Sequence, residues 1–228
     1  MSVITAAVDL RSLFGTARNQ GSRPTCLAFA ASDTHAALRS GWVPLSCEYA
    51  FYQAQRRAGR PPSKGALLSS MLDTLRQDGQ PEESGWPYLA VTPADAASWA
   101  PPAEVGPLFG RDGEKSSPSL DQIIRELDQG RPVIILLMLS RAFYSPTAQA
   151  VVDPAAGEAP EPERRHAVVA IGHGTVDGQR VILIRNSWGL KWGEAGHGWL
   201  TEQFLGPRIF AAATLMEDVD VSAHSAAA

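Results

Sequence analysis

Two short segments near opposite ends of the chain limit its fold more than any other feature of the sequence. Residues 20–30 contain Cys26, and the second segment combines His166 with residues 186–193, which begin at Asn186. A thiol nucleophile requires a base that accepts its proton and a third group that orients the base. Cys, His and Asn occur here in the order and at the long separations used by one type of thiol enzyme. We therefore expect a fold that brings both ends of the chain to one place.

The sequence around Cys26 predicts a helix. Residues 26–39 are rich in helix formers and contain neither Gly nor Pro, and they are followed by Gly41, which suits a left-handed helix end. Thr25 is the candidate N-cap, which places Cys26 in the first turn, where the helix dipole favours a thiolate. Taken alone, Cys26 would fit better as a small buried residue on an Ala-rich helix.

The second segment predicts a β-hairpin. Residues 165–172 and 180–186 are apolar and β-branched, and Asp177-Gly178 between them is a strong hairpin signal. Reflection through the turn places His166 opposite Gly189, about three residues from Asn186. The register stays open, because residues 172–174 could hold a bulge.

Elsewhere we expect helices at 45–53, 65–77 and 121–129, a buried strand at 133–139, and a surface connection at 92–119. Residues 145–163 form a Pro-rich loop that leads into His166, and we interpret it either as a lid or specificity element or as a tolerated surface insertion. We expect His35, His173 and His197 to be structural. No His or Cys pair has zinc-like spacing, so we predict no metal and no cofactor.

The two segments resemble the active-site segments of papain-like cysteine peptidases. The resemblance covers roughly residues 7–210, and residues 8–11 are similar to the start of that family's mature domain. It implies an α+β, papain-like two-lobe fold, with a helical lobe, an antiparallel β-barrel-like lobe and the active-site cleft between them. We expect one domain at 1–221, with the helical lobe at about 15–110 and the β lobe at about 111–221 plus the N-terminal segment. Residues 222–228 are expected to be a disordered tail.

The resemblance also assigns catalytic roles. Cys26 would be the nucleophile and His166 the base, with Asn186 orienting the imidazole. Gln20 would donate its side-chain amide to the oxyanion, beside the backbone N–H of Cys26. Gln20 alone could be an ordinary loop residue, but its spacing from Cys26 favours the catalytic role for both.

Four further residues are candidate substrate-binding or shielding groups. In the resembled family a tryptophan at the place of Trp188 shields the Asn–His pair from water, and Trp192 would line the leaving-group side; core packing is the alternative for both. Gly65 and Ala66 occupy the place of a loop that binds the substrate backbone as an added strand. Two departures from the family are Leu27 after the nucleophile and Arg165 before the base, where an inward guanidinium would disfavour the imidazolium.

Composition limits the partners and the compartment. The 228 residues carry a net charge of −4, which provides no basic patch for nucleic acid or an acidic membrane surface, and no apolar run approaches a transmembrane length. Residues 1–14 lack the pattern of a secretory signal. With two cysteines and no disulfide partner for Cys47, we expect a cytoplasmic protein, or an effector exported without a classical signal peptide.

The sequence thus predicts a cysteine peptidase that hydrolyses peptide bonds of a peptide or protein substrate through a thioester. One alternative keeps the thioester in an isopeptidase, amidase or acyl transferase, and another is an inactive papain-fold binding module. No pro-region precedes Cys26, so we expect a protein inhibitor or activator to replace it in controlling activity.

Overall fold

The computed structural model describes residues 3–94 and 97–221, and the chain divides into two compact units. The helical unit contains Gln20–Glu114 and the chain from Leu215, and the β unit contains the chain up to Asn19 and Lys115–Thr214. The expected lobe boundary near residue 110 lies close to this division. The segment after Leu215 differs, because we expected it in the β lobe and it clusters with the helices. The expected tail at 222–228 lies outside the described residues.

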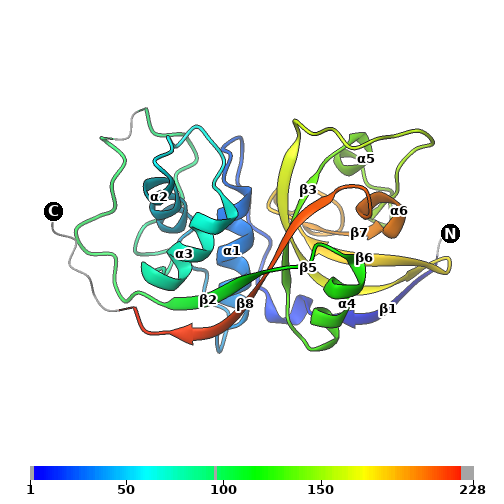
Figure 1. Ribbon diagram of the computed structural model, residues 1–228, viewed down its shortest axis with the longest axis horizontal. Coiled ribbons are helices and arrows are strands. Elements are labelled where there is room, and N and C mark those ends of the chain that lie inside the picture. The colour runs from blue at the N-terminus through cyan, green and yellow to red at the C-terminus, as the bar shows by residue number, and fades with distance from the viewer. Residues whose placement is uncertain (1–2, 95–96, 222–228) are drawn as a thin grey trace. The chain divides into compact units, whose positions relative to one another are not determined.

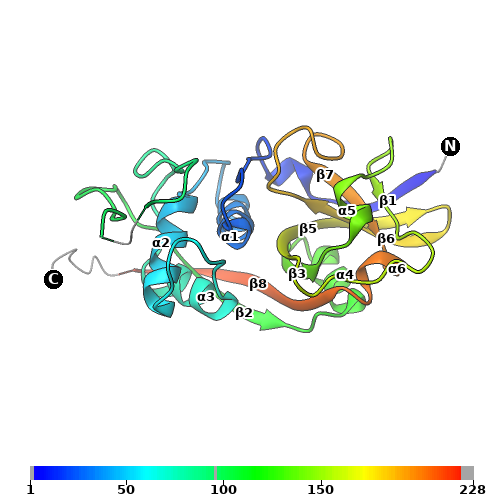
Figure 2. The same cartoon turned by 90° about the horizontal axis from the view of Figure 1, so that it is seen from above.

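Three helices build the helical unit: α1 (Cys26–Ala37), α2 (Cys47–Ala58) and α3 (Leu68–Gln77). They lie side by side in Figures 1 and 2. Every residue of α1 after Cys26 is buried. α2 is amphipathic; it begins where Ser46 Oγ accepts the Tyr49 N–H at 3.0 Å and ends at the left-handed Gly59. The three predicted helices are confirmed, with bounds shifted by a few residues.

A buried polar network lies inside the helical unit. His35 is fully buried, and its Nδ1 lies 3.1 Å from Gln80 Oε1. The Gln80 amide donates to Ser32 Oγ at 2.6 Å and to the Ser46 carbonyl at 3.1 Å. Burial lowers the pKa of His35 to about 4, so the imidazole is neutral at pH 7. The expected structural role of His35 agrees with this position.

The predicted surface connection at 92–119 is wrong in its last part. Residues Gly110–Ser116 form β2, which pairs with β8 (Ile209–Val219). Arg111 of β2 donates to the Met216 carbonyl at 2.6 Å and forms an ion pair with Asp218 at 2.5 Å. These bonds hold the chain from Leu215 in the helical unit. They are long-range contacts, which local composition does not reveal.

The β unit is built on one sheet with the strand order β8-β3-β5-β6-β7-β4, in which β1 (Ile4–Asp9) pairs with β5. The strands are β3 (Val133–Met138), β4 (Val151–Val152), β5 (Arg165–Val176), β6 (Gln179–Arg185) and β7 (His197–Thr201). All neighbours are antiparallel except β4 and β7. Within the described residues the sheet is not closed, since β8 and β4 at its two ends do not pair with each other.

Short helices cover this sheet. They are α4 (Leu120–Asp128), α5 (Arg141–Tyr144) and α6 (Glu202–Leu205), and the 3₁₀ turn η1 (Arg11–Leu13) follows β1. Ile123 and Leu127 of α4, Phe143 of α5 and Phe204 of α6 pack with the inner faces of β3, β5 and β6 in one hydrophobic core. The predicted helix at 121–129 and the strand at 133–139 are therefore confirmed.

The predicted hairpin forms between β5 and β6. Val176 pairs with Gln179, and Asp177 and Gly178 both have positive φ, as a two-residue type I′ turn requires. The register shifts between Ala170 and Gly172, just before the expected bulge region. Extrapolating the shifted ladder past its last pair, Val169 with Arg185, places Trp188 instead of Gly189 opposite His166. No helix in the described part of the chain is long and apolar enough to cross a membrane.

Candidate active site

In the β unit, His166 and Asn186 form the hydrogen bond that the sequence predicted. His166 lies near the start of β5, Asn186 directly follows β6, and His166 Nε2 lies 2.8 Å from Asn186 Oδ1. Asn186 Oδ1 also accepts the Ser187 backbone N–H at 2.8 Å, which identifies this atom as the oxygen. An oxygen acceptor requires that Nε2 carry the proton, so Nδ1 is the ring nitrogen left to exchange a proton.

Aromatic side chains surround this pair. The ring centroids of His166 and Trp188 are 4.9 Å apart, and Phe143 approaches His166 at 5.7 Å and Trp188 at 5.2 Å. Only 5% of His166 and 1% of Asn186 is exposed. Burial lowers the pKa of His166 to about 4, and the hydrogen bond to Asn186 opposes this shift only in part. The imidazole is therefore neutral at pH 7 unless an anion lies beside it.

Phe143 was missed in the sequence, although it lies at the centre of the aromatic cluster. It is fully buried, and its carbonyl accepts the Trp192 indole N–H at 2.9 Å. Trp192 is 6% exposed and packs against Phe143 at 4.9 Å. Trp192 thus belongs to the hydrophobic core, and its expected place on the leaving-group side stays a prediction. Residue 143 has no signal of its own, because it lies on a single helical turn between a strand and a loop.

The Pro-rich loop before His166 is tied to the β unit at several points. The Glu158 carboxylate accepts the backbone N–H groups of Ala142 at 2.8 Å and Ala155 at 3.1 Å. The buried Arg208 donates to the Glu158 carbonyl and to Ser140 Oγ, and β4 within the loop pairs with β7. These bonds favour a structural support for α5 over a lid. Arg165 is exposed and lies 5.5 Å from the Phe210 ring, so its guanidinium does not point toward His166.

In the helical unit, Cys26 is the first residue of α1 and is partly exposed. Thr25 occupies the N-cap position, but its side chain does not cap the helix. Its hydroxyl instead lies 2.8 Å from the Tyr88 hydroxyl, which donates to the Gln20 carbonyl at 2.8 Å. The Tyr88 hydroxyl has one proton, which it donates to Gln20, so the Thr25 hydroxyl must donate to Tyr88. Tyr88 therefore bridges both ends of the segment before Cys26.

Gln20 begins this segment, and its side-chain amide forms a hydrogen bond within it. Gln20 is 7% exposed, and its Nε2 donates to the Arg23 carbonyl at 2.8 Å. Gly21, in the left-handed region with φ of +60°, turns the chain between them.

Gly65 lies beside the nucleophile segment, while Ala66 is half-buried next to it. A Cβ added at Gly65 would lie 3.8 Å from the Pro24 carbonyl oxygen. Gln55 Nε2 holds this loop by donating to the carbonyls of Pro61 and Lys64, both at 2.7 Å. The predicted third helix begins only at Leu68, so Gly65 and Ala66 lie in the loop before it.

The chain that leads to Gln20 is anchored in the β unit beside Asn186. Arg185 donates to the carbonyls of Gly15 and Thr16, and Asn19 forms a β-bridge with Trp188. This anchoring could not be predicted from the sequence, because buried arginine donors have no local pattern. Gln20 and Cys26 belong to one unit, and His166, Asn186, Trp188 and Trp192 belong to the other. That the two sets form one site stays a prediction.

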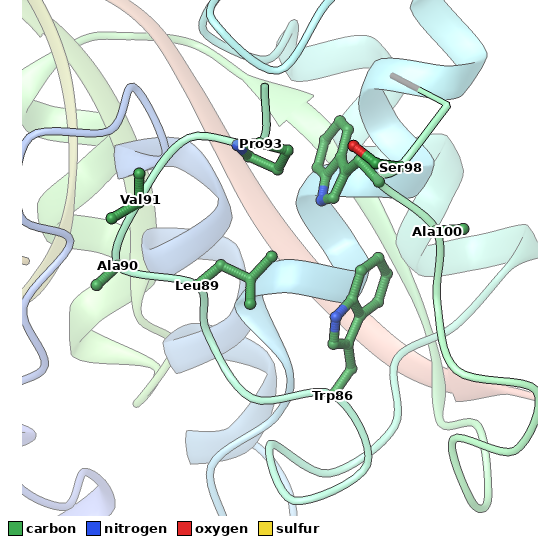
Figure 3. Close-up of a pocket in the computed structure, with 8 residues that line it drawn as sticks. Trp86, Leu89, Ala90, Val91, Pro93, Ser98 and Ala100 are labelled. Atoms are coloured by element: carbon green, nitrogen blue, oxygen red, sulfur yellow. The ribbon is translucent and has the colours of Figure 1, made fainter. Parts of the chain in front are cut away.

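The helical unit also holds an apolar pocket of about 530 Å³. Trp86, Leu89 and Pro93 surround it in Figure 3, and Val91, Trp99 and Ala100 complete most of its wall. Among the residues that the structure describes, no group of His, Cys, Asp and Glu side chains could hold a metal ion.

Comparisons with known proteins agree with the geometry. The family model for "Papain family cysteine protease" matches residues 4–205. A cysteine protease from Blomia tropicalis is 27% identical over 80% of this chain and 56% of its own length, and chymopapain from Carica papaya is 29% identical over 61% and 38%. The chain spans about half the length, or less, of these curated relatives.

Solved structures show the same fold. Xylellain, a cysteine protease from Xylella fastidiosa, superposes with a TM-score of 0.74 at 20% identity, over 93% of this chain and 86% of its own. The ragweed pollen cysteine protease Amb a 11, solved in its proform, gives a TM-score of 0.73 at 20% identity, over 94% and 66% of the two chains. The predicted α+β, papain-like fold is confirmed.

Proposed function

Because the chain belongs to the papain family of cysteine proteases, we propose that it is a thiol peptidase that uses Cys26, His166 and Asn186. The observation that carries the proposal is the buried His166–Asn186 hydrogen bond beneath Trp188. It orients the imidazole and assigns the proton to Nε2. In the helical unit, the position of Cys26 in the first turn of α1 supports its role as the nucleophile, because the helix dipole favours a thiolate there.

The reaction would be acyl transfer through a thioester. Cys26 Sγ transfers its proton to His166 and attacks the carbonyl carbon of the substrate, and Gln20 Nε2 with the Cys26 N–H stabilises the oxyanion. The C–N bond then breaks as His166 protonates the leaving amine. Water, deprotonated by His166, hydrolyses the thioester and restores the thiol. Burial disfavours an isolated His166 imidazolium, so the Cys26 thiolate would be the anion that stabilises it.

The proposal extends to partners and setting. The substrate would be a peptide or protein. The ragweed relative was solved in its proform, so we propose that a pro-region-type inhibitor controls this enzyme too. Neither Cys26 nor Cys47 forms a disulfide, which suits a reducing compartment such as the cytoplasm.

Intact-mass labelling with an epoxide inhibitor of papain-like enzymes tests the function. We expect one adduct on the wild-type protein, none on Cys26→Ala and a greatly slowed reaction for His166→Ala. Cys47→Ala is the matched control, because Cys47 is fully buried and should leave the rate unchanged. If Cys26 stays unlabelled while a small thiol reagent still modifies it, the peptidase proposal fails and the binding-module alternative stands. If Cys26 of the wild-type protein does react with the epoxide, assays of the unlabelled enzyme on a peptide library and on isopeptide-linked substrates would separate peptidase from isopeptidase activity.

A further inference from the structure

A buried ion pair joins the segment that precedes Cys26 to α2. Arg23 and Glu48 are 1% and 0% exposed, and they share two hydrogen bonds, Nη1 to Oε2 at 2.5 Å and Nη2 to Oε1 at 2.9 Å. Burying two charges carries a desolvation cost that often exceeds their attraction, so such a pair is weak evidence of a stabilising role. Its position suggests another purpose.

The pair is built into a network of fixed donors and acceptors. Glu48 also accepts the Trp99 indole N–H at 2.7 Å and the Leu89 backbone N–H at 3.1 Å, while Arg23 Nη1 donates to the Leu89 carbonyl at 2.5 Å. With these bonds the carboxylate and the fork of the guanidinium have one favoured geometry. Arg23 is therefore held at its side chain by α2 and by the segment at Leu89.

The same residue holds Gln20 through its backbone. The Arg23 carbonyl accepts Gln20 Nε2, and the Arg23 guanidinium lies 5.0 Å from the ring of Tyr88, whose hydroxyl bridges Gln20 and Thr25. A shift of Arg23 would thus move the amide proposed to stabilise the oxyanion and the first turn of α1. Displacements of about 1 Å in such groups can cost roughly a hundredfold in rate.

We propose that Arg23 and Glu48 are positioning residues that fix residues 20–26 in the reactive geometry. The inference rests on the proposed function, since it assigns Gln20 and Cys26 their catalytic roles. The network also extends to the pocket, because Leu89, labelled in Figure 3, and Trp99 contribute to its wall. Changes in this wall are therefore transmitted to the nucleophile segment through Glu48.

Two variants of different severity test the inference. The double variant Arg23→Met/Glu48→Leu removes both charges and leaves apolar side chains, a type of exchange that is often neutral for stability. Trp99→Phe keeps a ring but removes one donor to Glu48. Asp218→Asn is the matched control, because it removes a charged partner of Arg111 in the same unit without touching residues 20–26.

Two measurements are made on each folded variant: the epoxide inactivation rate, separated into binding and chemical steps, and amide hydrogen exchange of residues 20–26. We expect the chemical step to fall by roughly tenfold to a hundredfold in the double variant, by less in Trp99→Phe and not at all in Asp218→Asn, with binding unchanged. Amide hydrogen exchange at residues 20–26 should accelerate most in the double variant, less in Trp99→Phe and not at all in Asp218→Asn. The amides of α3 should keep their wild-type protection in all three. Restoring the charges as Arg23→Lys with native Glu48 should recover part of the rate.

The outcomes separate this inference from the proposed function. Wild-type rates and exchange in both the double variant and Trp99→Phe would overturn the positioning role while the enzyme remains a thiol peptidase. If the wild type itself takes up no label, the proposed function fails, and hydrogen exchange alone decides whether Arg23 and Glu48 hold the segment. If the double variant does not fold, Trp99→Phe and Arg23→Lys give the result.

Discussion

Replacing Phe143 by Leu should damage both the stability and the proposed base. Among the residues that the structure describes, Phe143 makes four ring contacts, with His166, Trp188, Trp192 and Phe204. Each aromatic pair contributes about 0.5–1.5 kcal/mol beyond area burial, so the loss of all four should lower the free energy of unfolding by about 2–6 kcal/mol. Leucine keeps much of the side-chain volume but removes the ring that packs against the imidazole, so water can reach His166. Because burial holds the pKa of His166 at about 4, water access should raise it toward its usual range.

The matched control for this change is Phe204→Leu. Phe204 is equally buried and contacts the ring of Phe143, but no ring contact joins it to His166 within the described residues. This variant should lose about 1 kcal/mol and leave the pKa of His166 unchanged. Urea unfolding gives the stability. An NMR titration of the imidazole gives the pKa, and it is made in the Cys26→Ala background so that no thiolate lies beside His166. Equal losses in the two variants, with His166 unaltered in both, would refute the view that Phe143 shields the base.

Three further changes have defined outcomes. Acid should destabilise the helical unit: the pKa of His35 is about 4 in the native state against 6.5 unfolded, so its contribution of about 3 kcal/mol is complete above pH 6.5 and is lost as the pH falls to 4. Unfolding of His35→Gln should show a flatter pH dependence; an unchanged slope would contradict this origin. Asn186→Ala should slow epoxide labelling by about tenfold or more, because it frees the imidazole to rotate, and a wild-type rate would remove Asn186 from the mechanism. A Cβ at Gly174 would lie 2.2 Å from the Thr5 carbonyl oxygen, so Gly174→Ala should displace β1 and cost about 1–3 kcal/mol, visible as faster hydrogen exchange of Ile4–Asp9; retained protection there would disprove the clash.

Local patterns in the sequence predicted the elements that carry the candidate site. The helix after Cys26, the hairpin at Asp177-Gly178 and the His166–Asn186 pair all depend on nearby residues: helix formers, a turn that requires positive φ, and two β-branched strands that pair across this turn. The prediction failed where pairing is long-range. β2 was expected as a loop because its polar residues are typical of loops, yet it pairs with a strand about a hundred residues away along the chain.

The sequence by itself determined the family, the main helices, the central hairpin and the identity of the candidate catalytic residues. Only the tertiary structure decided which side chains support them: Phe143 against His166, and Arg23 with Glu48 beneath Gln20. The physical reason is that catalytic groups have chemistry that restricts their residue type and spacing. Supporting groups need only the right shape or charge at a point in space, and many positions in a sequence can supply it.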